Sequence, residues 1–355
     1  MLWAVCLSKA YILFILSLLF GTATLTYCVK SYALRHLLDI PNDRSSHSVA
    51  TPRGGGVAIV VAVLVAVCLM YSTANLSVPL AGALLWGGLL VASIGFIDDH
   101  RPVIAPVRLF VHFLAVVWCV WLLGPIPPIN VGFGSWNLGI FGTSIAIVFL
   151  VWFLNLVNFM DGIDGLAAVE VISVSAIAAL LLASRSGYTT VFWLLVAISS
   201  AVGGFLTLNW PPAKIFMGDA GSGFLGFVLG AVAWASIAFG QLSVWVWLIL
   251  VGTFVCDASV TLFRRWRRGE KIQMAHRSHA YQRLSRRLGS HVKVTLGYLA
   301  VNLLWLSPLA FVAVRWPSYG APLTLLAWIP LGFIAWHLGA GLPDNKKNDF
   351  VPFRV

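Results

Sequence analysis

Charged residues are scarce in this chain of 355 residues, where Asp, Glu, Lys and Arg together make up 10% of the sequence. Soluble domains usually carry about 25%. Hydrophobic residues make up 60%, which is more than a soluble core can bury, so the bilayer must act as the solvent for most of the chain. The same excess of apolar residues excludes an intrinsically disordered protein.

Cysteine is also sparse, and its placement excludes two further classes of protein. The five cysteines lie in or next to apolar runs and form no CxxC pair, so we expect neither a disulfide framework nor a cysteine-based zinc site. The sequence has no GxxxxGKS/T phosphate loop and no stretch with the composition of a soluble domain. We therefore predict one transmembrane domain over residues 1–355. Its first apolar run follows Lys9 without a clear cleavage site, which predicts an uncleaved first span.

The apolar runs predict an all-α bundle of about eleven transmembrane helices. A helix needs about 20 apolar residues to cross the hydrocarbon core. On that scale the spans are expected at residues 10–29, 57–74, 79–97, 104–123, 141–158, 165–183, 189–208, 221–239, 242–263, 293–314 and 321–340. The uncharged segment 124–141 holds two short extended stretches, 129–133 and 136–140, and predicts a small hairpin.

Basic residues predict the orientation of the bundle. A net charge of +11 on a soluble protein would suggest nucleic acid, but Lys and Arg also gather in the cytoplasmic loops of membrane proteins, so we expect no nucleic-acid partner. With the N-terminus outside and the C-terminus in the cytoplasm, only Lys9, Arg185 and Arg315 of the 23 basic residues lie outside. The cytoplasmic loops are then expected near residues 30–56, 98–104, 159–165, 209–220 and 264–293.

Acidic residues gather on the same side of the predicted bundle. None of the twelve falls in an outside loop, and Glu170 and Asp257 fall within spans, nearer their cytoplasmic ends. The positive-inside rule does not require this of acids, and carboxylates at a membrane face are usually functional. We therefore expect the chemistry at the cytoplasmic face.

Glycines and a pair of aspartates mark the first two polar segments. Gly54, Gly55 and Gly56 stand where the second span begins, which would let backbone N–H groups approach a phosphate but equally suits an ordinary helix start. Asp98 and Asp99 adjoin each other at the end of the third span. A cation or a proton relieves their repulsion, and Mg²⁺ prefers such oxygen ligands; the alternative is a solvated helix end.

Two further segments carry amides and acids. Asn155, Asn158, Asp161 and Asp164 recur every third residue, so on a helix they form one polar stripe that must face a protein cavity rather than lipid. Polar contacts between helices would account for the asparagines but poorly for the acids. Asp219 stands at the start of the eighth span, where it either caps the helix or joins a metal-bound diphosphate.

Histidines distinguish the last cytoplasmic loop from its arginine-rich surroundings. The arginines at 264–268 are typical of a topology signal. His276 and His279 add nothing reliable to orientation, but they can hydrogen-bond phosphate oxygens, and Arg277 between them can hold a phosphate with two hydrogen bonds. A zinc site is not favoured because these loops lack cysteine.

Together these segments resemble a known family, the polyprenyl-phosphate N-acetylhexosamine-1-phosphate transferases. The matching segments occur in family order at residues 39–56, 97–99, 155–165, 209–222 and 276–284. The last loop lacks the run of consecutive histidines that is typical of the peptidoglycan-precursor branch. The chain looks more like the O-antigen-initiating, Pseudomonas-type branch.

The resemblance implies a reaction and its participants. A UDP-N-acetylhexosamine and undecaprenyl phosphate would give undecaprenyl-diphosphate-sugar and UMP at the cytoplasmic face of a bacterial inner membrane. Mg²⁺ is the implied cofactor, with Mn²⁺ as an alternative. Membrane lipid would surround the protein, and a homodimer is a further expectation.

Residue roles follow from the same resemblance, position by position. Asp219 matches the leading metal ligand, while Asp98 and Asp99 match residues assigned to metal binding or to activation of the lipid phosphate. The other implied catalytic positions are Asp161, Asp164, His276 and His279. The implied substrate-binding positions are His47, Asn158, Asn209, Phe216, Gly218 and Arg277.

Two other interpretations remain open from the sequence. One is a peptidoglycan-precursor phospho-sugar transferase of the same family. The other is a transporter, which would explain many spans and intramembrane acids but not why the acids gather at one face rather than near the midplane.

Overall fold

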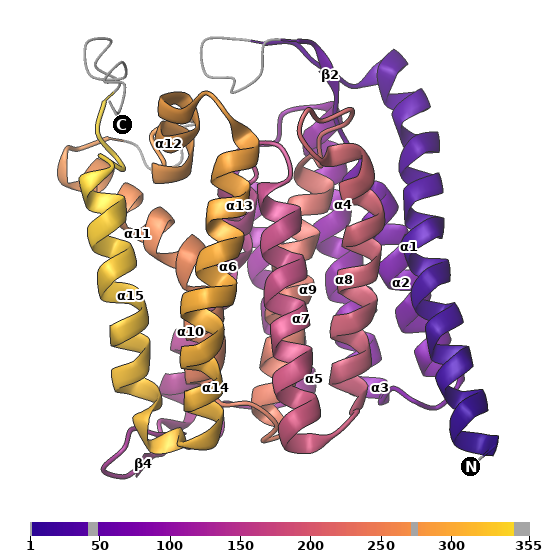
Figure 1. Ribbon diagram of the computed structural model, residues 1–355, viewed down its shortest axis with the longest axis vertical. Helices are drawn as coiled ribbons and strands as arrows, with labels where there is room; N and C mark the ends of the chain where they lie inside the picture. Colours follow the sequence, from indigo (N-terminus) through magenta and orange to yellow (C-terminus); the bar gives the residue numbers. More distant parts are fainter. Residues whose placement is uncertain (1, 42–48, 271–275, 344–355) are drawn as a thin grey trace.

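The computed structural model describes residues 2–41, 49–270 and 276–343, and it is helical apart from two short hairpins (Figure 1). The α-helices are α1 Leu2–His36, α2 Gly56–Ser72, α3 Val78–Gly82, α4 Gly88–His100, α5 Ala105–Leu123, α6 Gly139–Met160, α7 Leu166–Ser186, α8 Thr190–Asn209, α9 Asp219–Ala238, α10 Val244–Leu250, α11 Gly252–Arg267, α12 Ala280–Leu288, α13 His291–Val301, α14 Ser307–Arg315 and α15 Gly320–His337. π-Helical turns at Ala83–Gly87 and Asn302–Leu306 join α3 to α4 and α13 to α14, and a 3₁₀ turn at Pro317–Tyr319 precedes α15.

The predicted all-α membrane bundle is confirmed. In the described part of the chain, nine helices are long and apolar enough to cross a membrane, and α10 with α11 makes a tenth if that bent pair is one span. The apolar helix α2, with 17 residues, is shorter than these. Each of the eleven segments expected from the sequence falls on one of these helices or helix pairs. Apolar runs of span length therefore located the helices correctly.

One expected span, 242–263, is not a straight helix. α10 and α11 meet at 73°. Gly252 stands at the bend, where a Cβ atom would lie 3.2 Å from the indole of Trp328 on α15. Hydropathy records how apolar a segment is and not its direction, so this bend could not be predicted from the sequence.

The two ends of the bundle differ in composition. The start of α1 and the hairpin of β3 (Ile129–Asn130) and β4 (Ser135–Trp136) lie at one end (Figure 1). The pair β1 (Leu38–Asp39) and β2 (Thr51–Pro52), the helix α12 and the end of α15 lie at the other. We call this second end the polar end. That it faces the cytoplasm, with the N-terminus outside, remains a prediction.

The expected hairpin forms, but with shorter strands. Ile129 pairs with Trp136 and Asn130 with Ser135, antiparallel. The turn occupies residues 131–134, closed by a 3.0 Å hydrogen bond from the Val131 amide to the Gly134 carbonyl. The β1–β2 pair at the polar end was not expected from the sequence.

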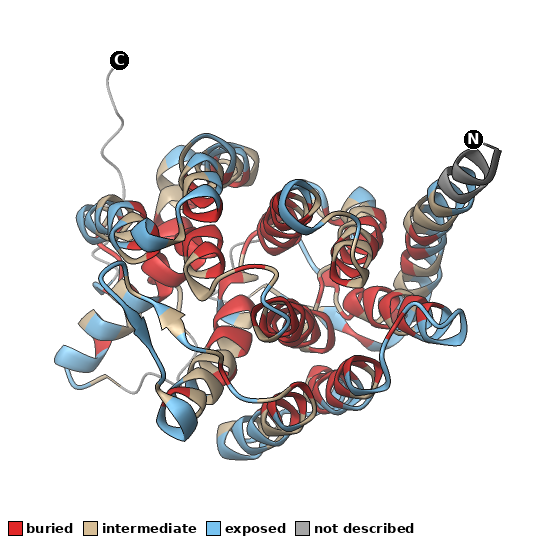
Figure 2. Cartoon of the chain, turned by 90° about the horizontal axis from the view of Figure 1, so that it is seen from below, coloured by how far each residue is buried: buried red, intermediate tan, exposed pale blue. Residues whose placement is uncertain are grey.

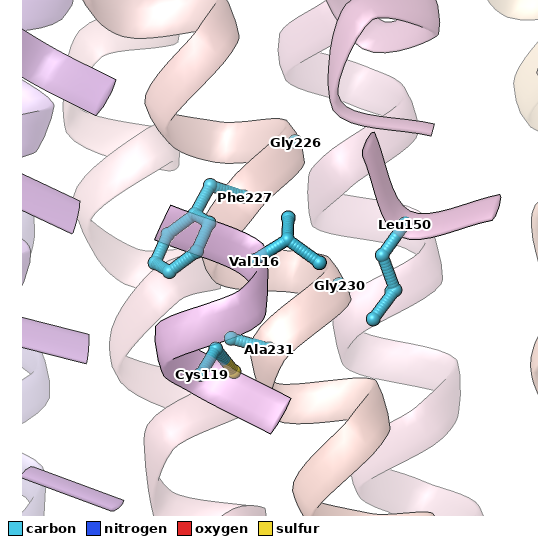
Figure 3. Close-up of a pocket in the computed structure, with 7 residues that line it drawn as sticks. All are labelled: Val116, Cys119, Leu150, Gly226, Phe227, Gly230 and Ala231. Atoms are coloured by element: carbon cyan, nitrogen blue, oxygen red, sulfur yellow. The ribbon is translucent and has the colours of Figure 1, made fainter. Parts of the chain in front are cut away.

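The core of the bundle is centred on α9. Of its most apolar window, 94% of the residues are buried, against 17% for α1. Buried residues gather on the inward faces of the helices and exposed ones on the outer faces (Figure 2). Gly226 lets α6 approach α9 closely, since a Cβ there would lie 2.9 Å from the Cα of Leu154. A small apolar cavity lies nearby between α5, α6 and α9 (Figure 3).

The arginines at 264–268 have a structural role that the topology interpretation missed. Arg264 donates to the carbonyls of Trp336 and Ala340 at 2.9 and 3.1 Å, and its guanidinium lies 3.4 Å from the centre of the Trp336 ring. Arg268 donates to the Gly341 carbonyl at 2.7 Å. The carbonyls at a helix C-terminus lack partners within the helix and favour cations. These arginines therefore tie α11 to the end of α15.

Candidate active site

An arginine bridges two of the expected site carboxylates at the polar end. Arg108, in the first turn of α5, donates to Asp98 at the end of α4 and to Asp219 at the start of α9, the latter at 3.0 Å. Asp98 also accepts a 2.6 Å bond from the Val103 amide. The structure thus brings Asp98 and Asp219 together, as the sequence led us to expect, although they are 121 positions apart in the chain. The guanidinium of Arg108 lies between them, and a guanidinium can also contact a phosphate.

Asp99 has a different environment from its neighbour Asp98. It is 3% exposed, and its two oxygens accept hydrogen bonds from the Asp219 and Ala220 amides at 3.0 and 3.1 Å. A side-chain oxygen in this position satisfies amides that have no partner within the helix. Asp99 therefore caps α9 from another helix and fixes the backbone of Asp219. The structure favours this orienting role over direct metal binding by Asp99.

The glycines of the first loop pack against α9 and its preceding segment. The amides of Gly55 and Gly56 donate to the carbonyls of Phe216 and Met217 at 2.9 and 2.8 Å. A Cβ on Gly56 would lie 2.3 Å from the Cα of Gly221. Both amides already have partners here, so the structure favours the ordinary helix start over phosphate contact by Gly55 and Gly56.

The polar stripe on α6 stops earlier than the sequence pattern suggested. α6 ends at Met160, so Asn155 and Asn158 lie on its last turns while Asp161 and Asp164 lie in the loop that follows. The repeat of three was therefore helical only in its first half. Asn155 is engaged with His112 of α5, at 3.2 Å between its Oδ1 and the imidazole Nδ1.

Asp161 is the least compensated carboxylate of the site. Burial raises its pKa well above the ordinary value, and the neighbouring carboxylates of Asp219 and Asp99 raise it further. Such a group favours a proton or a cation. Asp164, by contrast, accepts from the Ala213 amide at 3.1 Å and lies 3.2 Å from Nδ1 of His291 on α13. Asp164 therefore joins three parts of the polar end.

Asn209, expected to contact uridine, is used within the protein. It is 3% exposed; its Oδ1 accepts from the Gly165 amide at 3.0 Å, and its Nδ2 donates to the Ile215 carbonyl at 2.9 Å. It joins the loop after α6 to the segment before α9. Phe216 is partly exposed beside it, and Gly218 has φ +78°, with room for no Cβ because Asp99 Oδ2 would lie 2.7 Å away.

The histidine segment packs against the loop that carries Asp161. Tyr281, in the first turn of α12, donates its hydroxyl to the Phe159 carbonyl at 3.0 Å. A Cβ on Gly162 would lie 2.1 Å from that hydroxyl oxygen, so only glycine fits there. His276 and His279 stack with ring centres 4.8 Å apart. Both histidines are thus held at the polar end, with Arg277 partly exposed between them.

His276 is neutral at physiological pH. Burial lowers its pKa to about 3, with His279 and Arg265 contributing positive charge. Its Nδ1 lies 3.0 Å from the Ser278 hydroxyl and 3.4 Å from the Ser278 amide. Because that amide can only donate, Nδ1 is the acceptor and the ring proton is assigned to Nε2. His276 can therefore donate a hydrogen bond through Nε2.

Sequence reasoning missed several residues of this site. Arg108 was counted only as a topology residue, and His112, Tyr281 and His291 were not singled out. A signal was present for the first two: Arg108 and His112 are four positions apart, so they share a face of one helix. Nothing in the sequence indicated that this face meets the acids. His47 lies outside the described residues.

The carboxylates of the site fit a hard divalent cation that is also bound by substrate phosphates. Among the described residues, no group of three or more His, Cys, Asp or Glu side chains forms a complete metal cage. Mg²⁺, however, is commonly held by one or two carboxylates together with substrate phosphates. Asp161 and Asp219 offer such oxygens, and the excess negative charge around Asp161 is the observation that favours a cation there.

Comparisons with known proteins find one family model and several similar transferases. The model of glycosyl transferase family 4 matches residues 81–237, which include Asp98, Asp99, the segment 155–165 and Asp219. A Bacillus subtilis protein described as a probable undecaprenyl-phosphate N-acetylglucosaminyl 1-phosphate transferase is 28% identical over 78% of this chain and 77% of its own length. These matches support the resemblance to the polyprenyl-phosphate hexosamine-1-phosphate transferases that the sequence motifs indicate. The described site therefore lies largely within the part of the chain that is similar to phospho-sugar transferases.

Two other relatives show the breadth of this transferase family. The Salmonella typhi undecaprenyl-phosphate alpha-N-acetylglucosaminyl 1-phosphate transferase is 29% identical over 77% of this chain and 76% of its own length. The Lactiplantibacillus plantarum phospho-N-acetylmuramoyl-pentapeptide-transferase is 31% identical over 52% of this chain and 60% of its own length. Proteins named for N-acetylglucosaminyl 1-phosphate transfer and for muramoyl-pentapeptide transfer are thus both among the similar proteins.

Proposed function

We propose that the protein transfers an N-acetylhexosamine-1-phosphate from a UDP-sugar to undecaprenyl phosphate and releases UMP. An oxygen of the lipid phosphate bonds to the β-phosphorus of the UDP-sugar, and the bond from that phosphorus to the bridging oxygen of UMP breaks. The reaction would start a surface glycan such as O-antigen at the cytoplasmic face of the bacterial inner membrane.

One observation carries this proposal beyond the family resemblance. At the polar end, the Asp161 carboxylate is subject to the negative charge of Asp219, Arg108 is bonded to Asp219, and the same end carries a neutral histidine, His276. Both substrates are anions, so their approach requires cations and hydrogen-bond donors. An acidic pair suits a metal-bound diphosphate, while Arg108 and His276 suit phosphate oxygens.

We assign roles to these residues from their contacts. Asp219 and Asp161 would hold Mg²⁺, which would neutralise diphosphate charge when bound. Asp99 would orient Asp219 through the cap on α9. Arg108 would move from its carboxylate partners to the lipid or leaving phosphate. A lipid monophosphate has a second pKa of about 6 and is largely ionised at neutral pH, so a strong general base is unnecessary.

The acceptor's long isoprenoid chain requires apolar surface within the bilayer. An apolar cavity of about 220 Å³ lies between α6, α9 and α10, and its lining on α6 extends to Phe153. Phe153 is five residues before Asn158, or about 8 Å along the helix axis. The lining runs from Ile129 of the β3–β4 hairpin, at the opposite end, to Phe153, so this cavity could hold isoprenoid units that lie away from the phosphate.

The alternative within the family is a peptidoglycan-precursor transferase. The two differ in the donor, since that branch takes a muramoyl-pentapeptide where the proposed reaction takes an N-acetylhexosamine. The absence of consecutive histidines at 276–279 favours the proposed branch. The transporter interpretation has no support among the described relatives, which are named as transferases.

The test is UMP release by purified protein with undecaprenyl phosphate, Mg²⁺ and each of a panel of UDP-N-acetylhexosamines. UDP-N-acetylmuramoyl-pentapeptide serves as the competing donor, and Asp219→Asn as the control for contaminating enzymes. We expect lipid-dependent UMP release from at least one N-acetylhexosamine donor. Release only from the pentapeptide donor would assign the protein to the other branch.

A further inference from the structure

Asp257 is a buried carboxylate that the proposed reaction does not use. It lies on α11, is 2% exposed, and accepts hydrogen bonds from five donors. They are the amides of Ala280 and Tyr281 at 2.8 and 2.9 Å, the hydroxyls of Tyr298 and Thr261 at 2.8 and 3.2 Å, and Nδ1 of His279 at 3.3 Å. A buried ion with this many partners is held in one geometry.

Two of these donors make Asp257 the cap of α12. The amides of Ala280 and Tyr281 are in the first turn of that helix and have no acceptor within it. Asp99 does the same for α9, where it fixes the backbone of Asp219. In both cases a buried aspartate on one helix determines where the next helix begins. Each capped helix begins beside a proposed site residue.

Asp257 also contacts the imidazole of His279, so it holds this side chain as well as the start of α12. Nδ1 of His279 lies 3.3 Å from Oδ1 of Asp257, and because a carboxylate can only accept, this contact assigns the ring proton to Nδ1. His279 stacks on His276, and the next residue but one, Tyr281, is bonded to the Phe159 carbonyl beside Asp161. The position of Asp257 therefore sets the positions of both histidines relative to the acidic cluster.

We propose that Asp257 is a positioning residue for phospho-sugar transfer, acting through His279. The proposal rests on the proposed function, because it concerns the rate of that reaction. Asp257 touches no substrate in this account. It holds the start of α12 and the imidazole of His279 in the geometry that the transferring phosphate meets.

The same helix supplies a matched control. Thr253, one turn before Asp257, donates to Glu170 of α7 at 2.7 Å, and Glu170 accepts from Asn302 at 2.7 Å. This cluster is also buried and polar, and it joins α11 to its neighbours. It has no described contact with residues 276–281. Loss of the Thr253 hydroxyl should therefore affect stability without moving the histidines.

The experiment compares Asp257→Asn with Thr253→Val in the full-length protein, by kcat, donor KM and thermal unfolding. Asparagine has one acceptor oxygen and an NH₂ group, so at least one α12 amide or the Tyr298 hydroxyl would face a donor. Small displacements of a positioning group cost about 10²-fold in rate. We expect Asp257→Asn to lower kcat by that order with donor KM changed less than about threefold. Thr253→Val should lower Tm and leave kcat within twofold.

A double variant separates positioning from general damage. If Asp257 acts through His279, then Asp257→Asn combined with His279→Ala should be no slower than His279→Ala alone. Tyr298→Phe removes one donor to the same carboxylate with little change of shape and covers the case in which Asp257→Asn does not fold. It should lower kcat roughly fivefold, the effect of one hydrogen bond.

The outcomes distinguish the positioning role of Asp257 from the proposed transferase function. A wild-type protein that releases no UMP with any donor would overturn both. A wild-type protein that is active, with Asp257→Asn and Tyr298→Phe both turning over like Thr253→Val, would overturn the positioning role alone. Fully additive losses in the double variant would do the same, since they would show that Asp257 acts independently of His279.

Discussion

At the scale of single residues, adjacent aspartates have separate roles. Asp98 pairs with Arg108, while Asp99 caps α9. The sequence predicted that acids would gather at one face. The polar end does hold the five acids expected to be in the site: Asp98, Asp99, Asp161, Asp164 and Asp219. It could not assign roles, because two neighbouring residues on a helix point about 100° apart and only packing decides what each meets.

This separation predicts different consequences for Asp219→Ala and Asp99→Ala. Both should abolish transfer. Only Asp99→Ala should also lower thermal stability markedly, because it leaves two buried amides of α9 without an acceptor, at about 1–3 kcal/mol each. UMP release and thermal unfolding of the two purified variants check this. Near-normal turnover of either at saturating Mg²⁺ would remove that residue from the site.

His276 gives a prediction about pH. Burial and its positive neighbours lower its pKa to about 3. Above the ordinary pKa of about 6.5 the ring is neutral in both the folded and the unfolded chain, so the shift costs no stability there; stability is lost progressively as pH falls from about 6.5 toward 3, where only the unfolded chain gains the proton. His276→Ala should lower kcat by roughly 10²-fold, the effect of one positioned donor. The ratio of wild-type to variant kcat should stay constant from pH 6 to 8. A ratio that changes tenfold near pH 6.5 would show that His276 acts as a cation.

At the scale of elements, glycine determines how closely the helices of the site approach. Gly56 of α2 faces Gly221 of α9, and Gly162 lies under Tyr281. The sequence showed these glycines but left phosphate contact and an ordinary helix start equally open for the first loop. The structure shows a packing role, because α2 and α9 lie too close for a Cβ on Gly56. The amides of Gly55 and Gly56 donate to nearby carbonyls.

The packing interpretation predicts that Gly56→Ala destabilises the protein. Its Cβ would lie 2.3 Å from a backbone atom that cannot move independently, so we expect a loss of about 1–3 kcal/mol. Gly21→Ala on α1 is the control, because a Cβ there meets nothing within 4 Å. Thermal unfolding of both variants in one detergent provides the comparison. Equal stability of the two would mean that α2 and α9 are farther apart than described.

Helix positions were predictable while helix irregularities were not. Long apolar runs fix the spans because backbone groups in lipid must be hydrogen-bonded within a helix. The bend between α10 and α11 depends on Trp328 packing over Gly252, and α12 depends on a cap from Asp257. Both are contacts between residues distant in sequence, which hydropathy does not record.

At the scale of the whole molecule, charge asymmetry predicts the orientation. The polar end carries the arginines of α11 and α12, and the opposite end carries the uncharged β3–β4 hairpin. We expect reporter fusions at residue 289 and after residue 343 to be cytoplasmic and a fusion at residue 134 to be outside. A reporter active outside at residue 289 would overturn the topology and the cytoplasmic site together.

The central claim is that phosphate moves with the sugar, and labelled donor tests it most directly. Purified protein is given UDP-N-acetylhexosamine carrying ³²P in the β-phosphate, with undecaprenyl phosphate and Mg²⁺. The account predicts that the label enters the lipid fraction in equal amount to the UMP released, and that Asp219→Ala abolishes both. Label that stays in a released nucleoside diphosphate while sugar enters the lipid would contradict the account.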